Sequence, residues 1–551
     1  MNRLLVRSTG MCLLLLSSLV SLPLHAQFSQ QTESVPAVNA AEPTINAVSR
    51  SLAIDPRVIK VKGINSTDRD NNPIISADGN VIFFNSTRKG SRNWARFKLN
   101  NNRWDDDIYF STRVMMRRDE EVWNEPINLG PLINSSEDDG IAAVSADGQS
   151  AFFSSLKPGW ERDGGPFYRA KLAGTEWTEV SGMGGGISEF FRKRDKSGKF
   201  RMYGAAISSD GKQFFFATTL QSPSGSHQIW VSELHDGQWS YPSNLGSTIN
   251  TEGGCYAPFL ASDGKTLFFT RGSGAIGDDD IYVSTFRDGQ WQEPVNVGAP
   301  INTPGVDAFL SVPASGDRVY LSSSREGDED IFRTPLPEFL RPTKVVLLGG
   351  QVMESQTGEA LEANIIIEDL QSGEKIFNVN SNSATGKYTV VLQPGRDYGI
   401  SVAAKGHVFL SERYTIPENT EYVEFQRDFC IDKIREGRSF VVKNLFFGYN
   451  SDTLTTESRP ELDRLAEFLA EYPNAQIEIG GHTDNIGSAG YNVGLSRRRA
   501  EAVQRYLSET RGIDLGRLRT RGYGFTKPTA ANDSDEGRQQ NRRTEFTIIT
   551  M

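Results

Sequence analysis

The sequence predicts a multidomain, mainly β-structured protein with three folded parts. These are an all-β propeller of five blades, or six if a degenerate unit is counted, a small β-sandwich and a C-terminal α/β sandwich. A repeated hairpin pattern over residues 60–340 indicates the propeller, and short strands separated by glycine-containing turns over residues 343–426 indicate the β-sandwich. Strand and helix patterns alternate over residues 440–551, which is typical of an α/β domain.

Residues 1–26 have the features of a secretion signal. Two arginines precede an apolar run, and Ala26 ends a small-residue stretch that suits cleavage. The apolar run is interrupted by serines and Pro23, so we expect cleavage rather than a retained membrane anchor. Residues 27–59 are then an N-terminal linker.

The remaining chain is acidic, because removal of the signal takes the formal net charge from −10 to −12. A nucleic-acid partner would call for clustered Lys and Arg across a domain, so none is expected. No later segment has the apolar length of a transmembrane helix. Only two cysteines remain, so the domains must be stabilised by packed cores rather than by disulfides.

A repeat with an Asp-Gly or Ser-Gly turn fills the middle of the chain. Each copy has an apolar residue, the turn and an aromatic-rich run, and each therefore predicts a β-hairpin. Segments such as "DDDIYVST" downstream of the hairpins predict a third strand. The five copies are "ISADGNVIFFNSTR", "VSADGQSAFFSSLK", "ISSDGKQFFFATTL", "LASDGKTLFFTRGS" and "VPASGDRVYLSSSR".

These repeats resemble the TolB-type β-propeller family, which implies a disc that binds partners on a face. A degenerate sixth unit could occupy "SGMGGGISEFFRKRDKSGKFR". We interpret the acidic triplets as turn residues rather than as a calcium site, because they lack the alternating ligand pattern of a calcium loop. His227 and His235 have no visible nucleophile motif beside them, so no catalytic residue is assigned.

Residues 343–426 alternate in "KYTVVL" and "DYGISVAA", as half-buried strands do. Together with "TGEALEANIII" these segments resemble the carboxypeptidase regulatory-like module, which implies a spacer or docking surface. No metal site is assigned to His407, because no second ligand lies near it in the sequence.

In the last domain, "RPELDRLAEFLAEYP" and "SRRRAEAVQRYLSE" have the apolar spacing of amphipathic helices between strands. The predicted order is strand, helix, strand, helix, strand, strand. The segments "GHTDNIGSAGYNVGLSRRRAEAV", "RGYG" and "GRQQNRRTEF" resemble the OmpA-like C-terminal domain. That resemblance implies noncovalent binding of peptidoglycan through the diaminopimelate of its stem peptide, with Asp484 and Arg499 as the binding pair.

The two residue types suit such a ligand. Diaminopimelate ends in an ammonium and a carboxylate on one carbon, and a carboxylate and a guanidinium side chain complement these charges. Without the family motif, an ion pair between Asp484 and Arg499 would be the simpler interpretation. We also expect Gly487, Gly490 and Gly494 to form a tight loop and Ser496 to cap the following helix.

The resemblance adds further candidate peptidoglycan-binding residues, namely Asn485, Asn492, Leu495 and Arg543. Arg497 and Arg498 are expected on other faces of the helix, and His482 as a packed residue. Gly448 replaces an acidic residue that is common in the family, and we expect it to lie away from the binding pair.

The sequence thus predicts a non-enzymatic, periplasmic anchor without cofactor or metal. It would bind peptidoglycan, have the outer membrane as a further candidate location, and present the propeller to envelope proteins. Similar domain combinations occur in proteins that anchor the type IX secretion machinery. Two alternatives stay open at this point, an envelope hydrolase that uses the propeller and an outer-membrane barrel protein.

Overall fold

A computed structural model describes residues 58–91, 106–117, 120–137, 139–193, 200–442, 444–448 and 450–551. The predicted signal peptide and nearly all of the predicted linker lie outside the described residues. Within the described ranges, no helix is long and apolar enough to cross a membrane.

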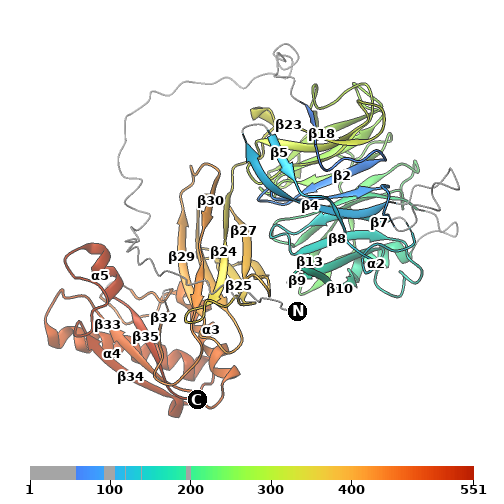
Figure 1. Cartoon of the computed structure of the whole chain (residues 1–551). Coiled ribbons are helices and arrows are strands. Elements are labelled where there is room, and N and C mark those ends of the chain that lie inside the picture. The colour runs from blue at the N-terminus through green and yellow to red at the C-terminus, as the bar shows by residue number, and fades with distance from the viewer. Residues whose placement is uncertain are drawn as a thin grey trace, which may run out of the picture.

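Five separate antiparallel sheets follow one another along the first half of the chain (Figure 1). The first contains β2 (Asp70–Ile75), β3 (Val81–Ser86), β4 (Asp107–Arg117), β5 (Glu120–Trp123) and β6 (Ile127–Asn128). The second contains β7 (Asp139–Val144), β8 (Ser150–Ser155), β9 (Phe167–Ala173) and β10 (Glu176–Gly182). The third contains β11 (Met202–Ile207), β12 (Gln213–Thr218), β13 (Gln228–His235), β14 (Gln238–Trp239) and β15 (Ser243–Asn244).

The fourth sheet contains β16 (Cys255–Leu260), β17 (Thr266–Gly272), β18 (Asp279–Arg287), β19 (Gln290–Trp291) and β20 (Val295–Asn296). The fifth contains β21 (Asp307–Ser311), β22 (Arg318–Ser323), β23 (Asp330–Pro335) and β1 (Ile59–Lys60). The strand β1 pairs antiparallel with β23, so the start of the described chain completes the last sheet. The first strands also touch in cyclic order, β2 to β7, β11, β16, β21 and back to β2.

The turns of the five hairpins explain why the repeat folds this way. Each predicted hairpin is present, and its turn glycine has positive φ, as at Gly79 (φ 68°) and Gly264 (φ 68°). An L side chain rarely adopts this conformation, whereas glycine does so freely. In the first hairpin, Ser76 Oγ donates to Asp78 Oδ1 at 2.5 Å and closes the turn from the side.

The acidic triplets act as hydrogen-bond acceptors inside the sheets. Asp280 accepts the backbone N–H of Ile276 at 2.7 Å and of Gly277 at 3.1 Å, and the Asn296 amide at 2.9 Å. Asp107 accepts the side-chain amide of Asn128 at 2.7 Å. These contacts fix neighbouring loops, but Asp280 and Asp107 are buried residues of β18 and β4, so the prediction that they are turn residues is wrong for these two.

The segment that could have held a sixth blade contains a helix instead. Helix α2 (Gly185–Arg192) buries Ile187, Phe190 and Phe191 against the aromatic core of the second and third sheets. Among the described residues of this segment there is no sixth sheet. A cluster of three adjacent aromatic and apolar side chains at helical spacing is the signal that distinguishes this insert from a blade.

Two four-stranded sheets form the β-sandwich. One contains β24 (Val346–Glu354), β27 (Lys387–Leu392), β30 (Val423–Gln426) and β31 (Phe429–Ile431), and the other contains β25 (Asn364–Asp369), β26 (Lys375–Asn380), β28 (Arg396–Ala403) and β29 (Leu410–Ile416). Strand β31 continues the parallel pairing with β24, so this sheet extends past the predicted boundary at residue 426. Short 3-10 turns and a π-helical turn occur at η3 (Glu338–Leu340), η4 (Thr456–Ser458), η5 (Tyr506–Thr510) and η6 (Leu515–Arg517).

The C-terminal domain has one sheet in the order β32 (Ser439–Val442), β35 (Thr544–Thr550), β33 (Gln476–His482), β34 (Leu518–Gly524). Helices α3 (Arg459–Glu471) and α4 (Ala489–Arg505) pack their apolar faces on this sheet around Leu465, Val503 and Ile479. The predicted order is confirmed except for α5 (Asp535–Asn541), a short helix before the last strand. That helix is strongly polar, so it has no apolar period by which to be found.

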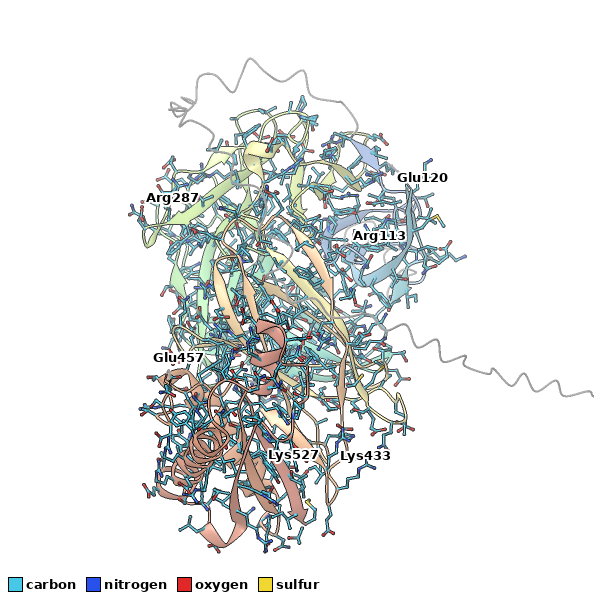
Figure 2. The ribbon with its side chains drawn as sticks, turned by 90° about the vertical axis from the view of Figure 1, so that its left-hand side faces the viewer. Arg113, Glu120, Arg287, Lys433, Glu457 and Lys527 are labelled. Atoms are coloured by element: carbon cyan, nitrogen blue, oxygen red, sulfur yellow. The ribbon has the colours of Figure 1, made fainter. Side chains whose placement is uncertain are left out.

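The β-sandwich lies between the five sheets and the C-terminal domain (Figures 1 and 2). Near the Asp-Gly turns, Ala77 and Ala314 pack against Val345, Leu347 and Val391 of the sandwich. In Figure 2, Arg113 and Glu120 lie in the upper half of the view, and Lys433 and Lys527 lie in the lower half. The sandwich therefore separates the sheets from the domain that carries the predicted binding pair.

Candidate functional site

The loop between β33 and α4 carries most of the predicted site. Helix α4 begins at Ala489, earlier than the sequence pattern predicted, and its N-cap is Ser488, whose Oγ accepts the N–H of Tyr491 at 3.3 Å. The prediction that Ser496 caps this helix is wrong, because Ser496 lies inside α4 and accepts the N–H of Gly524 at 3.0 Å. Of the three predicted loop glycines only Gly487 has positive φ, at 99°.

Two other glycines let α4 approach the sheet closely. A Cβ at Gly481 of β33 would lie 2.0 Å from the carbonyl oxygen of Ser496, and a Cβ at Gly522 of β34 would lie 2.6 Å from the backbone nitrogen of Arg497. Only glycine fits at such separations. These two positions therefore bring the Arg499-bearing helix down onto the strand that leads to Asp484.

Asp484 follows β33 and is buried, with 8% of its surface exposed. Its Oδ1 accepts the N–H of Ile486 at 3.0 Å, which fixes the carboxylate on its own loop. Its Oδ2 forms an ion pair with Nη1 of Arg542 at 2.6 Å. The carboxylate is thus oriented by the backbone on one side and by a cation on the other.

Arg499 is half-buried on α4. Its Nε donates to the carbonyl oxygen of Ser451 at 2.9 Å, and its guanidinium carbon lies 5.0 Å from the centre of the Phe447 ring. Burial lowers the pKa of Arg499 and the positive charge of Arg542 lowers it further, while the charge of Asp484 acts in the opposite direction. Electrostatic coupling to both residues places Asp484, Arg499 and Arg542 in one cluster.

In the described part of the chain, Asp484 and Arg499 form no ion pair with each other. The simpler interpretation, a salt bridge that would fill the site, therefore does not hold. Among the residues that the structure describes, no carboxylate contacts the terminal Nη groups of Arg499, whereas its Nε is fixed by Ser451. This leaves the planar end of the guanidinium able to bind a ligand carboxylate.

The expectation that Gly448 lies away from the binding pair is wrong. Gly448 belongs to the loop that holds Arg499 through Phe447 and Ser451, and the bridge between Phe447 and Leu454 closes this loop. The same loop reaches α4 a second time, because the Tyr491 hydroxyl donates to Asn450.

The remaining predicted residues have different environments. Asn492 is buried and donates to the carbonyl oxygen of Ile486 at 2.9 Å, so it holds the loop after Asp484 in place. Leu495 is buried in the same helix, and Asn485 is exposed beside Asp484. Arg543 forms an ion pair with Glu545 at 3.0 Å and donates to the carbonyl oxygen of Lys527, so these contacts are with neither Asp484 nor Arg499.

Arg542 is the residue that the sequence analysis missed. It is adjacent to Arg543 in "NRRTEF", and the two side chains point to different partners. Arg542 is the C-cap residue of α5, whereas Arg543 directly precedes β35. The end of this polar helix, which has no apolar period in the sequence, therefore determines that Arg542 faces Asp484 while Arg543 faces Glu545.

His482 is packed, as expected. It is 2% exposed and stacks on Tyr523 with ring centres 4.9 Å apart. Burial lowers the pKa of His482 to about 4, and the positive charge of Arg543 contributes to the shift. The expectation that Arg497 and Arg498 lie on other faces of α4 than Arg499 also holds. Both side chains are exposed, and Arg497 pairs with Glu501 at 3.5 Å.

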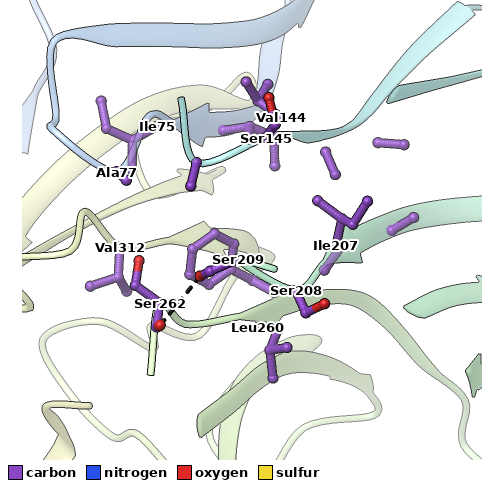
Figure 3. A pocket seen from close by; sticks show the side chains of 17 residues that line it. Ile75, Ala77, Val144, Ser145, Ile207, Ser208, Ser209, Leu260, Ser262 and Val312 are labelled. Atoms are coloured by element: carbon purple, nitrogen blue, oxygen red, sulfur yellow. Dashed lines mark hydrogen bonds between the residues drawn. The ribbon is translucent and has the colours of Figure 1, made fainter. Parts of the chain in front are cut away.

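A cavity of about 50 Å³ lies where the first strands of the five sheets meet (Figure 3). Each of these strands, or the residue directly after it, contributes to the lining, for example through Ile75, Val144, Ile207, Leu260 and Val312. The lining is apolar apart from serines, and Ser209 donates to the carbonyl oxygen of Ser262 at 3.3 Å across it. Such a lining offers no acid, base or metal ligand for chemistry.

The two histidines of the hydrolase alternative do not form a catalytic arrangement. The ring of His227 packs on Tyr203 and Tyr256, and His235 is exposed beside Glu233 at 3.3 Å. The described residues also contain no cluster of three or more His, Cys, Asp or Glu side chains able to hold a metal.

Comparison with known proteins identifies the class of the C-terminal domain. Residues 446–542 match the model of the OmpA family. The chain is 39% identical over 118 residues to the peptidoglycan-associated lipoprotein of Rhizobium meliloti, across 21% of this chain and 62% of the relative. It is 41% identical over 104 residues to outer membrane protein Omp38 of Acinetobacter baumannii, across 19% of this chain and 29% of the relative.

Among solved structures, the chain is similar to the peptidoglycan-associated lipoprotein from Burkholderia pseudomallei, with 29% identity over 20% of this chain and 88% of that chain and a TM-score of 0.18. The chain spans less than two thirds of the length of the two curated relatives. The C-terminal domain is OmpA-like, as the sequence motifs predicted, and the protein is periplasmic and associated with peptidoglycan.

Proposed function

We propose that this protein is a non-enzymatic anchor whose C-terminal domain binds peptidoglycan through diaminopimelate. Asp484 would accept hydrogen bonds from the ammonium of the ligand, and Arg499 would bind the carboxylate on the same carbon. The observation that carries this proposal is that the two opposite charges lie in one cluster without neutralising each other. A receptor for a zwitterion requires this arrangement.

The surrounding contacts prepare the site for such a ligand. Asp484 is fixed by Ile486, and Arg499 is fixed by Ser451 and the ring of Phe447, so little side-chain freedom is lost on binding. Burial strengthens both charges toward a ligand, because fewer water molecules compete with it. Asn492 stabilises the loop after Asp484, because its side-chain amide donates to the carbonyl oxygen of Ile486.

Retention of the purified protein on isolated peptidoglycan sacculi tests this proposal. Asp484→Asn or Arg499→Gln should each weaken binding by about 2 to 5 kcal/mol, because each leaves one ligand charge unpaired. Arg497→Gln is the matched control, since Arg497 lies on the same helix and points to Glu501. Equal retention of all three variants, with folding intact, would place the binding site elsewhere.

We further propose that the five sheets are the blades of a TolB-type propeller and that the sandwich is a regulatory-like module. The sandwich covers the Asp-Gly turns near the axis, which leaves the opposite face of the sheets for envelope proteins. A component of a secretion machine is one partner that this architecture would suit. Crosslinking in intact cells from cysteines placed on that face, followed by identification of the captured protein, tests this assignment.

A further inference from the structure

The ion pair between Asp484 and Arg542 conflicts with the simplest view of ligand binding. Both carboxylate oxygens of Asp484 already have a donor within the protein, Oδ1 the N–H of Ile486 and Oδ2 the guanidinium of Arg542 at 2.6 Å. A ligand ammonium that binds Asp484 must therefore compete with one of these donors. The backbone N–H belongs to the loop itself, so Arg542 is the partner that can leave.

The environment of Arg542 favours its departure. Its side chain is 40% exposed, against 11% for that of Asp484, so water can solvate the guanidinium once it is released. Its other terminal nitrogen donates to Gln539 on helix α5, which gives the side chain a second partner away from Asp484. Arg542 also lies at the C-terminal end of α5, where a positive charge is favourable.

We propose that Arg542 is an internal counter-ion that occupies the ammonium position of the site and is displaced by the amino group of diaminopimelate. This inference rests on the proposed function. Arg542 is then a residue that sets affinity and specificity. It keeps Asp484 oriented before a ligand binds, and each amino ligand must compete with it for that carboxylate. It also neutralises Asp484 toward ligands that carry a carboxylate alone.

Two ligands distinguish this role from its alternative, in which Arg542 is a second partner for the ligand carboxylate. Meso-diaminopimelate carries both charged groups, whereas pimelate is the same dicarboxylate chain without amino groups. If Arg542 is an internal counter-ion, its removal favours the amino ligand and leaves a bare Asp484 that repels pimelate. If Arg542 binds carboxylate, its removal weakens both ligands.

The test is isothermal titration calorimetry of the mature full-length chain with each ligand. Arg542→Gln should bind meso-diaminopimelate about two- to five-fold more tightly than the unmodified protein and pimelate less tightly, as expected for loss of a partly exposed ion pair. The affinities of Arg542→Lys, which keeps the charge, should lie between those of the unmodified protein and those of Arg542→Gln. Arg519→Gln, an exposed arginine of β34, is the control for the change in net charge and should leave both affinities unchanged.

Weaker or unchanged binding of meso-diaminopimelate by folded Arg542→Gln would overturn this inference and leave the proposed function intact. Absence of binding by both the unmodified protein and the variant would instead overturn the proposed function, and this inference with it. Thermal unfolding followed by circular dichroism shows whether each variant is folded.

Discussion

His482 illustrates how a single buried side chain at this site depends on pH. The residue stacks on Tyr523 beneath the loop of Asp484, and burial is the main reason why its pKa falls to about 4. In the unfolded chain a histidine has a pKa of about 6.5. Below that pH the unfolded state takes up a proton that the folded state excludes, so stability is lost as the pH falls toward 4.

We therefore expect the free energy of unfolding to fall by about 2 kcal/mol from this residue between pH 7 and pH 5. His482→Phe keeps the stacked ring but removes the titrating group. Calorimetric unfolding of the protein and this variant at the two pH values measures the difference. The same acid dependence in both would show that His482 is not its source.

Arg542 is a residue whose contact with Asp484 could not be predicted from a sequence motif. The sequence identified Asp484 and Arg499 through a long motif, and the structure brings both into one cluster. The sequence alone could not distinguish Arg542 from Arg543, because both are arginines in the same short motif and no local pattern shows where each side chain points. Only the cap of α5 and the start of β35 determine which guanidinium faces Asp484.

Among the elements, α4 depends on two glycines in the strands beneath it. Gly481→Ala should destabilise the protein by about 2 to 4 kcal/mol, because the new methyl group would meet the carbonyl oxygen of Ser496 at 2.0 Å. Gly490→Ala is the matched control inside α4, where no atom lies within 4 Å of a new Cβ. That change should stabilise the helix by about 0.5 to 1 kcal/mol.

Urea-induced unfolding measures both variants. A small effect at Gly481 would mean that the helix can shift on the sheet. Because Arg499 would move with it, such a shift would also question the geometry of the binding cluster.

The strands and long helices were predictable, and the exceptions have physical reasons. All five hairpins follow from turn glycines and aromatic runs, and α3 follows from its apolar period. The start of α4 was missed because its first turns are polar and contain two glycines, which are unfavourable inside helices. The roles of Gly481 and Gly522 depend on packing between elements, which no local pattern contains.

At the scale of the whole molecule, a buried charge network joins the sandwich to the C-terminal domain. Arg464 of α3 pairs with Glu368 of β25 at 2.8 Å and with Glu461 at 2.9 Å, and the three side chains are at most 10% exposed. Ser411 of β29 donates to Glu461 at 2.8 Å and extends the network. The network connects the C-terminal domain to the sandwich through buried side chains.

Arg464→Met should therefore cost about 3 to 5 kcal/mol, because it leaves two buried carboxylates without their cation. It should also speed proteolytic cleavage between the two domains. Lys344→Met is the control, since it removes an exposed pair with Glu421 and should cost less than about 1 kcal/mol. Equal cleavage rates for the two variants would show that the network does not hold the domains together.

The central claim is that the cluster of Asp484 and Arg499 recognises both charges of diaminopimelate. Retention on two kinds of sacculi tests it most directly, because lysine in the same position of the stem peptide carries the amine without the neighbouring carboxylate. The protein should be retained on sacculi that contain diaminopimelate and lost from those that contain lysine. Equal retention on both would contradict recognition of the zwitterion.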